Sequence, residues 1–314
     1  MGIIVENGGI LTTVQDEGRY GYQAYGVSTS GAMDAHSFHI ANLLVGNDKS
    51  EAALETTYMG PALEFTEDNV IAITGADMKP TIDGKEIPSY AAVAVKKGQK
   101  LVCGMAQNGC RGYIAFAGGL DIPEVMGSKS TLLRNHLGGL DGRKLEKGDK
   151  ITFTSPKSEL PNMENRRVAG EIFPDKEVVL RVVLGPQDDE FTEKGIKDFF
   201  WYKGTITQEF DRMGCRIDRE PIEMSGDGNI NTDGISLGSI QVPGNGKPII
   251  MLSDRQSTGG YPKIGTVISV DIAKIAQSRP GQKIRFINVS LGLAQDLYVR
   301  ELEYIENLDK KLNH

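Results

Sequence analysis

Glycine is the residue that most constrains the fold of this chain. The sequence of 314 residues contains 38 glycines, and many of them adjoin short β-branched or other apolar runs. Such runs, separated by turn-forming pairs such as Asp83-Gly84 and Asn108-Gly109, are typical of strands joined by tight turns. The sequence therefore predicts a mainly β protein with a few helices (α+β).

Short apolar runs bounded by turn residues mark the expected strands. These strands are residues 70–74, 91–95, 101–105, 113–117, 151–154, 178–184, 205–210, 249–252 and 266–270. Three helices are expected, at residues 33–45, 272–277 and 291–312. Ser30 or Asp34 is the expected cap of the first helix, and Asp271 that of the second.

The polar segment 155–176 contains three prolines and predicts a linker. A chain of this length also suggests about two domains. We therefore expect a β-rich domain over residues 1–160, a β-barrel domain over residues 175–290 and a C-terminal helix over residues 291–314.

Composition excludes several classes of protein. The formal charge of −7 and the pI of about 5.3 argue against a general nucleic-acid binder, since binding to phosphate backbones requires clustered Lys and Arg. No apolar run is long enough for a membrane span, and the first residues lack the features of a signal peptide. The three cysteines show no Cys-x-x-Cys spacing, which fits reduced thiols. We expect a cytoplasmic protein that binds neither nucleic acid nor membranes.

His36 and His39 stand at helical spacing, which could present two imidazoles to one metal ion. No matching pair of His or Cys residues lies nearby in the sequence, so we expect surface histidines and no metal site.

The densest group of reactive side chains occupies residues 253–263, directly after an apolar run that predicts a buried strand. Charges at the end of a buried strand must be paired or exposed in a cleft. An Arg fork beside a carboxylate suits capture of a planar carboxylate, carbamate or phosphate. The alternative is a polar turn in which the Asp-Arg pair holds neighbouring loops. The expected catalytic residues are Asp254, Arg255, Gln256, Tyr261 and Lys263.

A second polar group lies near the N-terminus, where Asp16 and Arg19 again place an acid beside a guanidinium. Backbone N–H groups at Ser30 and Gly31, before a helix, could bind an anion, although ordinary capping explains Ser30 and Asp34 as well. The expected substrate-binding residues are Gln15, Arg19, Tyr22, Ser30, Asp34 and Arg212.

Arg212 follows the expected strand at residues 205–210. Arg19, Arg212 and Arg255 thus all adjoin glycine turns and acidic neighbours. Three such forks indicate an anionic substrate, although structural ion pairs give the same pattern.

Nucleotide and biotin motifs are absent from the sequence. There is neither a Gly-x-x-x-x-Gly-Lys-Ser/Thr phosphate loop nor a strand-linked Gly-x-Gly-x-x-Gly, and no Gly-x-Ser-x-Gly elbow. An Ala-Met-Lys-Met type of segment for covalent biotin is also missing. If ATP or biotin takes part, another chain is expected to supply the phosphate loop or the carrier.

Several motifs together resemble one family. They are Leu-Thr-Thr-Val-Gln-Asp-Glu-Gly-Arg at 11–19, Ser-Gly-Ala-Met-Asp at 30–34, Arg-Gly-Tyr-Ile-Ala-Phe-Ala-Gly-Gly at 111–119, Asp-Arg-Met-Gly at 211–214, Ile-Gln-Val-Pro at 240–243 and Asp-Arg-Gln at 254–256. Over residues 8–288 the chain resembles the allophanate-hydrolase-subunit-2 family, which includes the C subunits of 5-oxoprolinases and the carboxyltransferase part of urea carboxylase. Cys215 and the spacing around Asn231 depart from the family pattern.

The resemblance implies a β-rich fold with cyclophilin-like barrel character, and an active cleft completed by a subunit-B-like partner. With subunit-A-like and subunit-B-like proteins, such a chain would convert 5-oxoproline to glutamate with ATP hydrolysis, as a hydrolase. The Arg forks would hold the carboxylate of this small anionic lactam. Two alternatives remain open: a carboxyltransferase that accepts a carboxyl group from carboxybiotin and acts on urea or a related amide, and a regulatory antagonist of a kinase inhibitor.

Overall fold

A computed structural model describes residues 2–313, which divide into two compact units. Unit 1 comprises residues 2–20, 30–173 and 303–313, and unit 2 comprises residues 21–29 and 174–302. Residues 155–173 of the segment expected to be a linker therefore belong to unit 1. The expected helix residue 314 lies outside the described residues.

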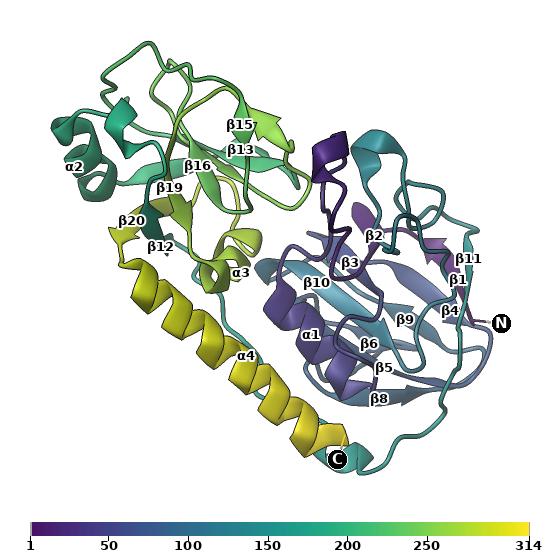
Figure 1. Ribbon diagram of the computed structural model, residues 1–314. Helices are drawn as coiled ribbons and strands as arrows, with labels where there is room; N and C mark the ends of the chain where they lie inside the picture. Colours follow the sequence, from purple (N-terminus) through teal and green to yellow (C-terminus); the bar gives the residue numbers. More distant parts are fainter. Residues whose placement is uncertain (1, 314) are drawn as a thin grey trace. The chain divides into compact units, whose positions relative to one another are not determined.

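Unit 1 is built from two β-sheets (Figure 1). The six-stranded sheet has the order β11-β1-β4-β9-β6-β7, from strands β1 (Gly2–Asn7), β4 (Ala62–Phe65), β6 (Thr81–Ile82), β7 (Lys85–Glu86), β9 (Lys100–Val102) and β11 (Lys150–Thr152). The five-stranded sheet has the order β2-β3-β10-β5-β8, from strands β2 (Leu11–Gln15), β3 (Ala53–Thr57), β5 (Asn69–Asp77), β8 (Ala92–Val95) and β10 (Asn108–Phe116).

Strand β10 shows how the sequence builds the two cores of unit 1. Side chains alternate between the faces of a strand. Ile114 and Phe116 therefore join residues of the six-stranded sheet in one apolar core. Tyr113 and Ala115 join a second core, to which helix α1 (Ala35–Leu44) contributes. Helix α1 thus covers the outer face of the five-stranded sheet.

Unit 2 contains a closed barrel of seven strands in the order β12-β19-β16-β17-β14-β13-β20. They are β12 (Glu177–Leu184), β13 (Gly204–Phe210), β14 (Gly214–Asp218), β16 (Ser239–Gln241), β17 (Ile249–Met251), β19 (Lys263–Val267) and β20 (Lys283–Asn288). A separate two-stranded sheet joins β15 (Asp233–Gly234) to β18 (Thr258–Gly259). The barrel confirms the mainly β fold with barrel character.

Two α-helices lie entirely within unit 2, namely α2 (Glu193–Trp201), which the sequence patterns did not predict, and α3 (Ile272–Ala276). Phe199 of α2 is fully buried and stacks on Phe286 of β20, with ring centroids 4.5 Å apart. The last helix, α4 (Leu291–Asn313), contributes residues to both units. The short 3-10 turns are Gln23–Tyr25, Leu133–Asn135, Met163–Asn165, Asp188–Glu190 and Ser269–Asp271.

A buried arginine stabilises the C-terminal ends of two helices in unit 1. Arg166 donates hydrogen bonds to the carbonyls of Leu43 and Leu44 in α1 (3.2 and 3.0 Å) and to the carbonyl of Leu312 in α4 (2.8 Å). Carbonyls at a helix C-terminus have no hydrogen-bond partner within the helix. A cation placed there donates hydrogen bonds to them and interacts favourably with the helix dipole. Arg166 lies in the segment expected to be a linker, which explains why that segment is fixed to unit 1.

Most expected elements are confirmed, with shifted ends. Asp34 is the cap of α1, since its carboxylate accepts the N–H of Ser37. Asp271 occupies the cap position of α3 but makes no capping hydrogen bond, because Arg181 engages its carboxylate.

Two strands end three residues earlier than expected. The strand expected at 266–270 is β19, which ends at Val267, because residues 269–271 turn into a 3-10 helix. The strand expected at 101–105 ends at Val102. The N–H groups of Cys103 and Gly104 bond instead to the carbonyls of Pro61 and Met78, outside a regular ladder.

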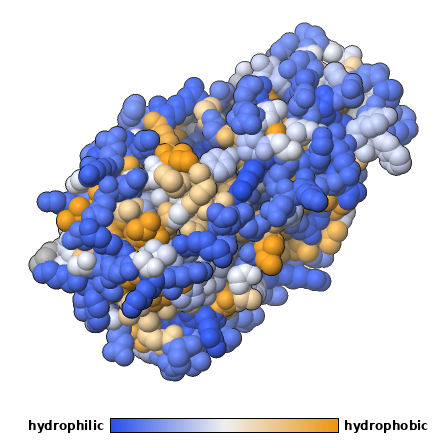
Figure 2. Space-filling view, turned by 180° about the vertical axis from the view of Figure 1, so that it is seen from behind, coloured by the Kyte–Doolittle hydropathy of each residue, from blue (hydrophilic) through white to orange (hydrophobic). Residues whose placement is uncertain are grey.

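Figure 2 shows one face of the molecule, which is mostly hydrophilic with apolar residues interspersed. Among residues 2–313, no helix combines the length and the apolar character that crossing a membrane requires.

Candidate functional site

A buried ion pair in the predicted catalytic segment joins Asp254 to Arg212. The guanidinium donates from Nε and Nη2 to the two carboxylate oxygens at 3.0 and 2.9 Å, and both side chains are 5% exposed. The backbone N–H of Asp254 also bonds to the carbonyl of Arg212 at 2.8 Å. Asp254 thus occupies the fork that the sequence pattern offered to a substrate. We interpret this pair as one that fixes two loops of unit 2.

Arg255 is also directed at its own chain. Its Nε donates to the carbonyl of Ile235 at 3.0 Å, and its Nη1 donates to Thr29 Oγ1 and to the carbonyl of Leu252, each at 3.3 Å. Ser28 Oγ donates to the carbonyl of Arg255 at 2.6 Å. Arg255 therefore ties the segment 21–29, which enters unit 2 from the N-terminal part of the sequence, to the loop after β17.

Lys263 belongs to a different group of polar side chains. It opens β19, its side chain is 3% exposed, and its ammonium donates to Asp233 Oδ2 at 2.7 Å and to the carbonyl of Gly234 at 3.1 Å. Gln187 Nε2 donates to the same Asp233 oxygen at 3.1 Å. The hydrogen bond from Lys263 lowers the pKa of Asp233 below its usual range, and bonds from the N–H of Gly234 and from Gln187 add to this.

Asp233 and Gln187 were not among the site residues predicted from sequence. Gln187 lies in the turn after β12, and Asp233 lies on β15, where the spacing departs from the family pattern. Gln187 lies 76 residues and Asp233 lies 30 residues from Lys263 along the chain. No local sequence pattern therefore indicated that these three residues lie together.

Three further predicted residues belong to unit 2 without joining these pairs. Gln256 is exposed, Tyr261 is 41% exposed, and Tyr22 is half-buried before a 3-10 turn. The carbonyl of Tyr261 accepts a hydrogen bond from Gln241 Nε2 at 3.4 Å, so its backbone is fixed while its ring meets solvent.

In unit 1, Arg19 is completely buried. Its Nε donates to the carbonyl of Val125 at 2.8 Å, and its Nη2 donates to the carbonyls of Ser128 and Ser130 at 3.4 and 2.9 Å. The same loop is held by Asp16, whose carboxylate accepts the backbone N–H of Lys129 at 2.6 Å. Arg19 organises this loop and has no exposed surface to offer to a substrate.

Gln15 and Ser30 are buried beside this loop, and both donate hydrogen bonds to the carbonyl of Thr131, at 3.0 and 2.9 Å. These two predicted residues therefore do lie together.

Two residues that the sequence patterns did not single out fix the turn before α1. Glu55 accepts the N–H of Met33 and the hydroxyl of Tyr113, both at 2.8 Å, and the Tyr113 hydroxyl accepts the N–H of Asp34 at 2.8 Å. Burial raises the pKa of Tyr113 well above its usual value, so the phenol stays protonated at neutral pH.

His36 and His39 are half-buried, which corrects the expectation of surface positions. His36 pairs with Glu171 at 3.0 Å and stacks on Tyr304, and His39 pairs with Glu17. No group of three or more His, Cys, Asp or Glu side chains suited to a metal ion occurs within residues 2–313.

All three cysteines are buried, and none of them forms a disulfide. Burial raises the pKa of Cys103 to about 12, which suppresses its thiolate and makes it a poor nucleophile.

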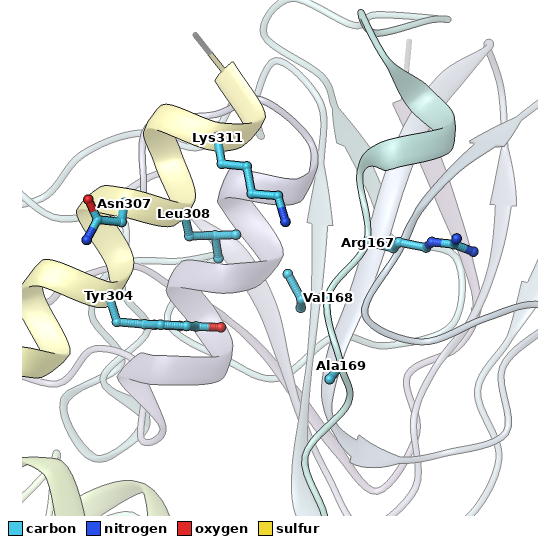
Figure 3. A pocket seen from close by; sticks show the side chains of 7 residues that line it. All are labelled: Arg167, Val168, Ala169, Tyr304, Asn307, Leu308 and Lys311. Carbon is cyan, nitrogen blue, oxygen red and sulfur yellow. The ribbon is translucent and has the colours of Figure 1, made fainter.

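A cavity of about 580 Å³ lies in unit 1 between α4 and the segment 167–169 (Figure 3). Lys311, Leu308 and Tyr304 point from α4 toward this segment, whereas Arg167 points away from the helix. None of the residues predicted from sequence to act in catalysis or binding lines it.

The predicted residues thus fall into two sets. Gln15, Arg19, Ser30 and Asp34 belong to unit 1, and the others, namely Tyr22, Arg212, Asp254, Arg255, Gln256, Tyr261 and Lys263, belong to unit 2. Within these sets, the side chains with exposed partners or surfaces are those of Lys263, through Asp233, of Tyr261 and Gln256, and of the half-buried Tyr22.

Comparison with known proteins gives consistent matches along the chain. The model of the family described as carboxyltransferase domain, subdomain A and B, matches residues 25–288. The C subunit of 5-oxoprolinase from Escherichia coli is 37% identical over 307 residues, which are 98% of this chain and 97% of that protein. The urea amidolyase of Saccharomyces cerevisiae is 34% identical over 96% of this chain but only 17% of that protein.

A solved structure agrees with the sequence matches. The crystal structure of the Kluyveromyces lactis urea carboxylase superposes with a TM-score of 0.91 at 31% identity, over 98% of this chain and 29% of that one. This chain therefore corresponds to one part of that longer polypeptide.

Proposed function

The chain belongs to the family of carboxyltransferase domains with subdomains A and B, and from this premise we propose that it is the C subunit of a 5-oxoprolinase. The observation that carries the proposal is the end-to-end match to the Escherichia coli protein, over 98% of one chain and 97% of the other. The proposed reaction opens the lactam of 5-oxo-L-proline to give L-glutamate.

A second candidate is carboxyl transfer to urea or a related amide. The fit to the urea carboxylase structure favours it, because that protein contains the same fold. The Escherichia coli relative is, however, more similar to this chain in sequence, at 37% identity against 31% for the urea carboxylase structure. We therefore place 5-oxoprolinase first.

The proposed reaction needs partners. The C subunit of an enzyme implies other subunits, and we propose an A-like and a B-like chain in the cytoplasm. The sequence of this chain lacks a phosphate loop and a biotin-attachment motif, so its residues do not fit a nucleotide phosphate site of that kind. The ATP of the proposed complex is therefore assigned to a partner.

The contribution of this chain would be to bind and orient the substrate. Hydrolysis breaks the C–N bond of the lactam and adds the water hydroxyl to carbon and a proton to nitrogen. The lactam ring is neutral, so the carboxylate of 5-oxoproline is the charged group by which a protein can orient this substrate. Arg19 and Arg212 bond to buried partners, whereas the partner of Lys263, Asp233, is 51% exposed, so Lys263 is the better-placed cation in the predicted set.

Reconstitution tests the proposal. The chain, co-purified with A-like and B-like subunits, should release glutamate from 5-oxoproline when ATP is present, without biotin or bicarbonate. Omission of this chain alone should abolish glutamate release, and avidin should have no effect. ATP turnover that needs bicarbonate and urea, and that avidin inhibits, would instead establish carboxyl transfer.

A further inference from the structure

We propose that Lys263 and Gln187 form an oxyanion-binding site, which the carboxylate of Asp233 occupies until a small-molecule carboxylate or phosphate replaces it. As the site of a substrate anion, this inference rests on the proposed function. As an anion site, it stands on the geometry around Lys263.

The ammonium of Lys263 is buried. The side chain of Lys263 is 3% exposed, and a buried ammonium is tolerated only with an anion and hydrogen-bond acceptors around it. An ammonium carries three N–H donors. The described residues supply two acceptors, Asp233 Oδ2 and the carbonyl of Gly234, so one donor remains available to a ligand atom.

Asp233, the ion-pair partner of Lys263, is exposed to solvent. The side chain of Asp233 is 51% exposed, although its partner is almost completely buried. Asp233 lies on the two-residue strand β15, which pairs with β18 in a sheet separate from the barrel. A short, solvent-facing element of this kind opens locally at low free-energy cost. A displaced Asp233 carboxylate would be hydrated at once, whereas Lys263 would need a replacement anion.

The backbone of Lys263 orients the side chain of Gln187. Its Oε1 accepts the backbone N–H of Lys263 at 3.1 Å, which directs its Nε2 toward Asp233 Oδ2. The ammonium and the amide therefore converge on one carboxylate oxygen, at 2.7 and 3.1 Å. Asp233 shows where the oxyanion of a ligand would sit. The chemical class is a small carboxylate or phosphate, since both present an oxygen to two converging donors.

The test is a binding experiment in which two substitutions have opposite effects. Inorganic phosphate and 5-oxoproline are titrated separately into the full chain by isothermal titration calorimetry. Asp233→Asn removes the competing charge and should tighten anion binding about tenfold, whereas Lys263→Met should weaken it at least about tenfold, since a hydrogen bond to a charged group contributes this order of affinity. A preference for 5-oxoproline identifies a substrate carboxylate, and a preference for phosphate identifies a phosphoryl group.

Asp218→Asn is the matched control, because Asp218 pairs with Lys247 at 2.6 Å in the same unit, with both side chains exposed. It should leave both affinities unchanged. Asp233 is exposed, so Asp233→Asn should fold even if Lys263→Met does not, and thermal melts verify this. Unchanged or weaker binding by Asp233→Asn, or no binding of either anion at millimolar concentration, would overturn the anion site. Opposite shifts in binding together with no glutamate release by the complex would overturn the 5-oxoprolinase assignment alone.

Discussion

Asp254 accepts two hydrogen bonds from the guanidinium of Arg212, at 3.0 and 2.9 Å, in a setting where each side chain is 5% exposed. This is the arrangement by which an arginine binds a substrate carboxylate, but here it joins two loops of the same unit. A pattern of acids beside arginines can therefore describe the framework of a site as well as its binding groups.

Loss of Asp254 should destabilise the protein strongly. Asp254→Ala leaves the charge of Arg212 buried without this carboxylate, and breaking a buried pair in this way costs about 3–5 kcal/mol. Urea unfolding measures the change. Asp218→Ala, which breaks the exposed pair with Lys247, should cost less than about 1 kcal/mol. Equal effects of the two substitutions would contradict the assignment of a buried structural pair.

Arg255→Lys distinguishes a structural arginine from a ligand-binding one. The guanidinium reaches three acceptors, at Ile235, Thr29 and Leu252, which the single ammonium of lysine cannot satisfy in the same geometry. We expect a loss of about 1–3 kcal/mol in the free energy of unfolding, seen as a lower melting temperature. An unchanged melting temperature with lost activity would support the direct role that the sequence suggested.

The stability contributed by Asp271 should depend on pH. Burial alone would raise its pKa, but hydrogen bonds from Arg181 and Lys274 outweigh burial, and the pKa lies below its ordinary value of 3.8. A carboxylate with a lowered pKa in the folded state stabilises the fold above the unfolded-state pKa, and this contribution is lost as the pH falls through the folded-state pKa.

Asp271→Asn should therefore be less stable than the parent protein at pH 7 and at pH 5, by a constant amount. The difference should shrink below about pH 3.8, where the unfolded carboxyl becomes protonated. Urea unfolding of both proteins across this range gives the curve. A difference that stays constant down to pH 3 would show that the charge of Asp271 does not contribute.

Arg166 should hold the end of α4 in place. Arg166→Met removes the donors to the carbonyls of Leu43, Leu44 and Leu312, and unsatisfied buried carbonyls cost about 1–3 kcal/mol each when no water replaces the donor. We expect lower stability and faster amide hydrogen exchange in the last turns of α1 and α4. Arg167→Met, at the exposed neighbouring position, should change neither quantity measurably.

Local patterns predicted those elements whose determinants are local. Helix α1 combines a cap at Asp34 with apolar side chains at helical spacing, and β12 is a valine-rich segment, so both are visible in a short window of sequence. Helix α2 was missed because it is nine residues long, contains Gly195 and buries little besides Phe199.

The partners of the candidate site residues could not be predicted in the same way. Arg212 bonds to Asp254, which lies 42 residues away in the sequence, and Arg19 bonds to Ser130, which lies 111 residues away. A charged residue in a glycine turn can pair with a residue of the same chain or with a ligand. The tertiary structure decides between the two, so the local sequence does not reveal the partner. Sequence reasoning thus named Lys263 as a candidate but named neither Asp233 nor Gln187.

The closure of the barrel in unit 2 has a consequence for synthesis of the chain on the ribosome. Strand β12 lies beside β20 in a parallel pair that runs from Glu177 and Lys283 to Val182 and Asn288. Until the residues of β20 have left the exit tunnel, one edge of β12 has no neighbour and could pair with another chain. Unit 2 therefore completes its folding only after Asn288 has emerged, and nascent chains stalled before residue 283 should be prone to aggregate.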